Sequence, residues 1–141
     1  MDMAGGTETP APETPHPSAG RWDTLPDDQL LRQRICDLDL RIEGSMIEPR
    51  VQQLYAELDA NGIRFHPACY LSTEWLCPDR IPMIGIPFAL AHPRLIQLER
   101  AIMMEVEGET EAECMQLLRH EAGHAINYAY CLFRRSRWRE L

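Results

Sequence analysis

The chain has 141 residues, of which 45% are hydrophobic, so it is long enough for one packed domain and a tail. Its formal net charge of −8 disfavours nucleic acid as a partner. No apolar run is long enough to span a membrane, and the first twenty residues lack the charged start and apolar stretch of a secretory signal. These features favour a cytoplasmic protein without membrane contact.

Five cysteines occur without the close paired spacing of a disulfide framework, which favours a reducing compartment. We expect all five cysteines to be mainly small, buried hydrophobic residues. They are Cys36, Cys69, Cys77, Cys114 and Cys131.

The N-terminal part is predicted to hold a tail and two helices. Residues 1–20 are rich in Pro and Thr and are predicted to be a disordered tail, followed by one domain over residues 21–141. A first helix is predicted to start near Asp23 to Asp28. It would bury apolar residues at helical spacing, namely Leu31, Ile35, Leu38 and Ile42. A second helix is predicted over 46–60, between a Ser45–Glu48 capping box and Asn61-Gly62.

The middle of the chain changes character. Short strands are predicted at 63–65 and 70–72, with a turn at Asp79-Arg80. The apolar run 81–90 contains two prolines and a glycine, which is typical of an edge or irregular strand. Residues 94–107 fit a mainly helical or mixed segment.

A long helix is predicted over about 111–133. Thr110 and Glu113 have the spacing of a capping box, and no proline follows Thr110. Apolar residues then recur at helical spacing and form a stripe that suits a buried face. They are Met115, Leu118, Ala122, Ala125, Ile126 and Ala129.

This helix carries the pattern His-Glu-x-x-His at residues 120–124. His120 and His124 are four residues apart, so both imidazoles lie on one face and can bind one metal ion. Zn²⁺ suits two neutral imidazoles and a position left for water. Glu121 lies about 100° around the helix from His120, where a carboxylate can act as general base on that water.

Three further residues could complete the metal site. Glu140 would lie about 24 Å beyond His124 if the helix continued, so it would need a sharp chain reversal. His66 and His92 each precede a proline and are more typical of structural turns.

Three further residues follow the motif on the same helix. Tyr128 could line the pocket or stabilise an oxyanion, although packing is its commoner role. Asn127 could orient a ligand imidazole, or be an exposed amide. Cys131 is too distant to share the metal on a straight helix.

Several runs together resemble a bacterial family of zinc-binding metallopeptidases. They are EGSMIEPRVQQLYAEL (43–58), IPFALAHPRL (86–95), EVEG (105–108) and CMQLLRHEAGHAINYAY (114–130). The resemblance implies a zincin-like α+β fold with N-terminal helices, a small irregular sheet and a long C-terminal HExxH helix. It implies His120 and His124 as zinc ligands and Glu121 as the base, with the substrate extended beside an edge strand over the motif helix.

The sequence thus predicts a zinc-dependent metallopeptidase that acts on a peptide or protein substrate. In such proteins a third ligand lies beyond the motif helix, so we expect the domain to continue past residue 141 and the chain alone to have weak or no turnover. The alternatives are a catalytically inactive zincin remnant with a structural or binding role, and a different zinc hydrolase built on the same helix. The sequence does not indicate an oligomeric state.

Overall fold

The computed structural model describes residues 21–140, except for the side chain of Trp138. The predicted tail at 1–20 lies outside the described residues. The chain divides into two compact units, Met1–Leu38 and Asp39–Leu141, which are described separately below. One domain over 21–141 stays a prediction. No helix within residues 21–140 is both long enough and apolar enough to cross a membrane.

The first unit contains short helical turns instead of the predicted long helix. A 3₁₀ helix at Trp22–Thr24 is followed by α1 (Asp27–Leu30) and a second 3₁₀ helix at Ile35–Leu38. The prediction of a continuous apolar stripe is wrong here, because Leu31 is 58% and Ile35 47% exposed. Leu38 of the same stripe is buried, so the stripe does not form one continuous packed face, and packing supplies most helical stability.

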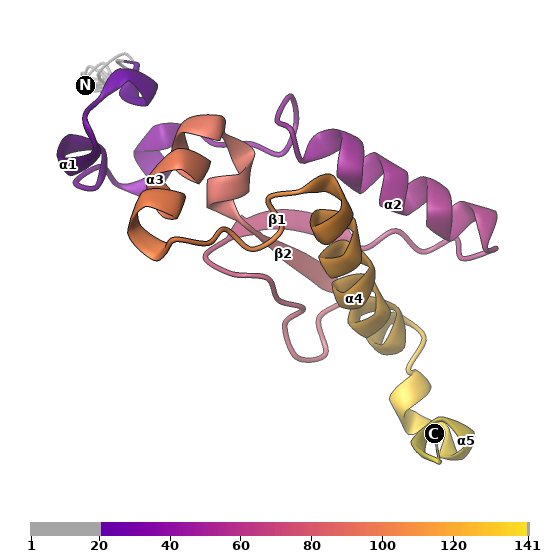
Figure 1. Ribbon diagram of the computed structural model, residues 1–141. Helices are drawn as coiled ribbons and strands as arrows, with labels where there is room; N and C mark the ends of the chain where they lie inside the picture. The colour runs from indigo at the N-terminus through magenta and orange to yellow at the C-terminus, as the bar shows by residue number, and fades with distance from the viewer. Residues whose placement is uncertain (1–20, 141) are drawn as a thin grey trace, which may run out of the picture. The chain divides into compact units, whose positions relative to one another are not determined.

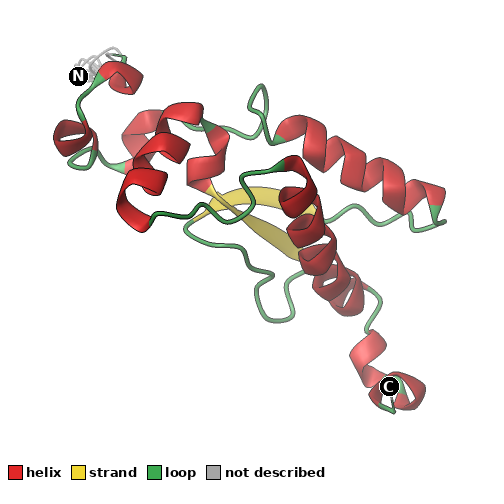
Figure 2. Cartoon of the chain, in the orientation of Figure 1, coloured by secondary structure: helices red, strands yellow, loops and turns green. Residues whose placement is uncertain are grey.

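The second unit is a mixed α+β structure, which confirms the predicted fold class at that level (Figures 1 and 2). Its elements run in the order α2, β1, β2, α3, α4 and α5. Their bounds are α2 Glu48–Ala60, β1 Ala68–Ser72, β2 Met83–Pro87, α3 Pro93–Met103, α4 Glu111–Ala129 and α5 Ser136–Arg139.

Helix α2 agrees closely with the segment predicted at 46–60. Glu48 does not complete the expected capping box, because its Oε2 accepts a hydrogen bond from Gly44 N at 2.8 Å. Ser45 Oγ instead accepts from Ile47 N at 3.2 Å. At the other end, Asn61 caps the helix and Gly62 takes a positive φ of 74°, which favours glycine.

The sheet consists of β1 and β2, which pair in parallel with Tyr70 opposite Gly85. The strand predicted at 70–72 is confirmed within β1, and that at 81–90 is confirmed in its central part. The strand predicted at 63–65 is wrong, because this segment lies outside the ladder. After β2 the chain enters a 3₁₀ helix at Phe88–Ala91, where Pro87 and the buried apolar residues direct it away from the sheet.

The connection between the strands returns along the outer edge of β2. Leu76 forms an isolated antiparallel bridge with Gly85, in which Gly85 N donates to Leu76 O at 2.7 Å and Leu76 N donates to Gly85 O at 3.2 Å. A Cβ on Gly85 would lie 3.0 Å from both Leu76 Cδ2 and Ser72 Cβ, so any other residue would force these neighbours to shift by a few tenths of an ångström. The predicted turn at Asp79-Arg80 is present, with Arg80 at φ 59°.

The core lies where α2 and α4 pack on each other and α4 packs on β2. Its fully buried side chains come from all three elements and their flanks, namely Ile47, Leu54, Ile84, Ile86, Leu90, Cys114 and Leu118. Cys114 confirms the expected burial of cysteine. The expectation is wrong for Cys36 and Cys131, which are exposed.

Helix α3 shows that residues 94–107 are helical only as far as Met103. His92 Nδ1 accepts a hydrogen bond from Arg94 N at 3.1 Å and so caps the helix start. Met104 ends the helix with φ 62°, and residues 104–107 form neither helix nor strand.

An ion pair joins the exposed edges of α2 and α4. Arg119 Nε and Nη2 donate to the two carboxylate oxygens of Glu57, both at 2.8 Å. These hydrogen bonds, with a further one from Gln53, lower the pKa of Glu57 from 4.5 to about 2. The pair fixes α4 against α2 one residue before His120.

We predict that Glu57→Gln lowers stability near neutral pH and that this difference from the wild type shrinks in acid. A carboxylate with a lowered folded-state pKa stabilises the protein above its unfolded pKa, and the contribution is lost as the pH falls towards about 2. Urea denaturation at about pH 7 and about pH 3 measures both differences. Glu105→Gln, at an exposed carboxylate, is the control. A difference that is constant with pH would contradict the assignment.

Candidate metal site

Helix α4 presents the motif because its two faces are chemically distinct. Thr110 Oγ1 accepts from Glu113 N at 3.2 Å, so the predicted cap at the helix start is formed. Cys114, Leu118 and Ala125 are fully buried on the core side. His120 and His124 lie on the exposed side. The burial of one stripe therefore directs the two imidazoles away from the core.

The two imidazoles converge. Nε2 of His120 and Nε2 of His124 are 3.2 Å apart, with ring centroids at 4.9 Å and ring planes at 75°. Two nitrogen ligands of a tetrahedral Zn²⁺, each at its usual bond length, lie about 3.3–3.4 Å apart. The observed separation thus fits two positions of a zinc site, and it also suits an N–H···N hydrogen bond between the rings.

Glu121 lies at the boundary between the buried and the exposed face. The residue is 8% exposed, and its carboxylate has no hydrogen bond or ion pair among residues 21–140. Its oxygens are not among the fully buried unpaired side-chain atoms, which are Glu99 Oε2 and Asn127 Oδ1. An uncommitted carboxylate next to two converging imidazoles can accept a proton from water.

The connection 73–82 brings two further groups to this face, which the sequence did not indicate. Burial raises the pKa of the Cys77 thiol, and the nearby Glu121 carboxylate raises it further. Asp79 Oδ1 accepts a hydrogen bond from Tyr128 Oη at 3.3 Å. The sequence predicted only the turn at Asp79-Arg80. The position of this turn beside α4 follows from the parallel pairing of β1 with β2, which no local sequence pattern predicts.

Tyr128 and Asn127 are therefore held differently. Tyr128 contacts the connection through Asp79 and stacks edge to face on Phe133, at a centroid distance of 6.2 Å. Asn127 is half-buried with an unpaired Oδ1, so it is not the freely exposed amide considered above.

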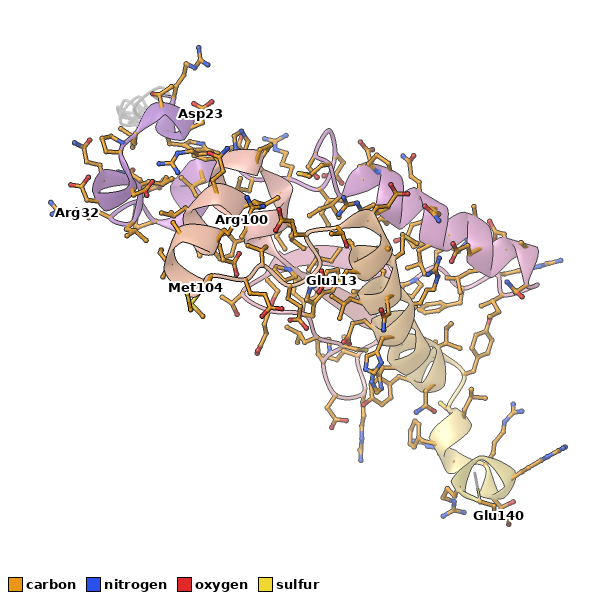
Figure 3. All side chains as sticks on the ribbon, viewed as in Figure 1. Asp23, Arg32, Arg100, Met104, Glu113 and Glu140 are labelled. Carbon is orange, nitrogen blue, oxygen red and sulfur yellow. The ribbon has the colours of Figure 1, made fainter. Side chains whose placement is uncertain are left out.

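The helix ends earlier than predicted, and this changes the position of the last candidates. α4 stops at Ala129 rather than near Phe133, and Cys131 adopts φ 51° before a 3₁₀ helix at Leu132–Arg134. The chain then forms α5, and Glu140 follows it. In Figure 3, Glu113 lies at the start of α4 and Glu140 lies beyond the other end of that helix.

None of the predicted third ligands joins the histidine pair. His66 Nε2 contacts Asp59 Oδ1 at 2.9 Å and its ring stacks on Tyr55, while His92 caps α3. Within residues 21–140, no three His, Cys, Asp or Glu side chains are grouped so that they could hold a metal ion. His120 and His124 are thus the two imidazoles that the described chain brings together.

Comparison with known proteins gives no relative from which a function could be transferred, because no protein family, curated protein or solved structure matches this chain.

Gly123, between the two histidines, gives a test of the helix itself. A Cβ at this position would meet nothing within 4 Å. We therefore predict that Gly123→Ala stabilises the protein by about 0.5–1 kcal/mol, because alanine loses less backbone entropy in a helix. Chemical denaturation measures the change, and Gln116→Ala, at another exposed position of α4, should have little effect. A loss of stability would show that the space above Gly123 is filled.

Proposed function

We propose that this chain is a zinc-dependent metallopeptidase-like hydrolase of zincin type, with the site on α4. The observation that carries the proposal is the 3.2 Å separation of the two Nε2 atoms, next to the buried and uncommitted Glu121. The zincin-like assignment is supported by the mixed α+β unit in which α4 packs on a short sheet.

In this proposal each residue has a separate role. His120 and His124 bind Zn²⁺ through Nε2, in their neutral form. When bound, zinc would lower the pKa of a water ligand and polarise a substrate carbonyl. Glu121 takes a proton from the attacking water and passes it to the leaving amine. The substrate peptide lies extended along the segment around Leu76, which pairs with Gly85 on the edge of β2 that faces away from β1.

A second candidate is a metal-binding scaffold without turnover. The observation that favours it is that residues 21–140 bring two metal-binding side chains together rather than three. The two candidates share the histidine pair and differ in whether Glu121 acts on a substrate.

We predict that the purified protein binds about one Zn²⁺ per chain, since two helical imidazoles supply half of a tetrahedral shell. The combined substitution His120→Ala and His124→Ala should abolish binding in elemental analysis and in competition with a chromophoric chelator. His66→Ala and His92→Ala remove the other described histidines and should retain the metal. Zinc content that is unchanged in the combined variant would contradict the site.

We further predict that Glu121→Gln separates binding from chemistry. The amide keeps the size of the side chain but cannot act as a base, so zinc content should persist while peptide hydrolysis falls by about 10²-fold or more. His124→Ala should lower both quantities, because it removes a ligand. Hydrolysis that is unaffected by Glu121→Gln would refute the role of the base. Hydrolysis that depends on Glu121 would refute the second candidate, whereas stoichiometric zinc without hydrolysis in the wild type would favour it.

A further inference from the structure

The outer edge of β1 carries backbone groups that no part of the described chain satisfies. Gly85 uses its N–H and C=O for Leu76, so these groups point away from β1. In the parallel register Tyr70 lies opposite Gly85 and therefore directs its own N–H and C=O towards β2. The alternate residues, Cys69 and Leu71, then direct theirs to the open edge.

No backbone hydrogen bond to these groups of Cys69 and Leu71 is formed from outside the strand pair within residues 21–140. Unpaired edges of this kind accept an added strand. The other edge of the sheet differs, because Leu76 occupies it.

Two hollows lie along this open edge. One has a volume of about 250 Å³ and separates the segment Leu40–Glu43 from Cys69, Tyr70 and Leu71. The other has a volume of about 240 Å³ and continues from Ile42, Glu43 and Cys69 to the first turns of α2, where Val51 and Tyr55 form its apolar wall. Each is too small for a drug-sized ligand and large enough for one long side chain.

The charge of the hollow beside α2 is negative. Glu43 and Glu48 line the hollow beside α2, and neither forms an ion pair within the described residues. Arg41 lines the other hollow, but its guanidinium is bound by Asp39 at 3.0 Å. A long side chain with an apolar stem and a cationic head fits an apolar wall with carboxylates at the rim.

We propose that the open edge of β1 is a docking site for an extended segment of a partner protein that carries a lysine or arginine. The segment pairs its backbone with the free groups of Cys69 and Leu71. Its basic side chain enters the hollow beside α2, with the head at Glu43 and Glu48. The site uses the edge opposite to Leu76 and does not depend on the histidine pair.

The test uses fluorescein-labelled pentapeptides of sequence Thr-Val-Lys-Val-Thr and the full chain, with fluorescence anisotropy as the measurement. The lysine peptide should bind, and the peptide with glutamate at the centre should bind at least about tenfold more weakly, since it places a like charge against the rim. N-methylation of alternate backbone amides on one edge of the peptide should also abolish binding, since it removes the hydrogen bonds to the strand. Equal affinity for the lysine and glutamate peptides, or no binding of the lysine peptide, overturns the proposal.

Variants of the protein locate the site. The combined substitution Glu43→Gln and Glu48→Gln should weaken the lysine peptide by about three- to tenfold, whereas Glu105→Gln should leave it unchanged. Leu71→Pro removes an N–H from the open edge, and if circular dichroism shows it folded it should weaken binding by about fivefold. Addition of a zinc chelator should have no effect. An affinity that the double substitution leaves unchanged, or binding that the chelator abolishes, overturns the proposal independently of the function assigned to α4.

Discussion

The apolar stripe of α4 is the constraint on which the second unit depends. Leu118, Cys114 and Ala125 are fully buried, and each residue of a helix is rotated by about 100° from the last. Once this stripe packs against β2 and α2, the rotation of the helix about its axis is fixed. The direction of the opposite stripe is then fixed as well. The 3.2 Å approach of the two Nε2 atoms is thus a consequence of core packing together with staggered rotamers, rather than of contacts made by the rings with the rest of the chain.

Glu121 shows why the same rotation matters for chemistry. A carboxylate one position after His120 falls at the edge of the buried face, and it is 8% exposed with no hydrogen bond or ion pair within residues 21–140. The Arg119–Glu57 pair lies on the other side of the helix and opposes a rotation that would bury the histidines. The consecutive residues Arg119, His120 and Glu121 therefore face three directions, so that Arg119 pairs with Glu57 while His120 and Glu121 take the positions of the proposed ligand and the proposed base.

The sequence predicted the parts that depend on local pattern. The capped start of α4, the extent of α2 and the turn at Asp79-Arg80 follow from side-chain hydrogen bonds and backbone preferences within a few residues. It failed where distant packing decides. Leu31 and Ile35 of the predicted stripe are exposed, and α4 ended at Ala129 because Cys131 turns the chain.

The residues of the candidate site also fall into those that the sequence predicted and those that it missed. His120, His124 and Glu121 were predicted because a helix fixes their relative directions, and the structure places the two imidazoles together as expected. The neighbours Cys77 and Asp79 were missed, because they reach α4 only through the parallel pairing of β1 with β2. No periodicity in residues 73–82 encodes that pairing.

A single glycine connects the sheet to the site. The connection 73–82 lies tightly against β2 at Gly85, where a Cβ would meet Leu76 Cδ2 at 3.0 Å and would force it to shift by a few tenths of an ångström. Leu76 precedes Cys77, and Asp79 follows two residues later with its bond to Tyr128. The position of the groups that flank Glu121 therefore depends on a backbone contact within the sheet. It follows that the surroundings of the proposed base are set by strand pairing, while the histidines are set by the helix.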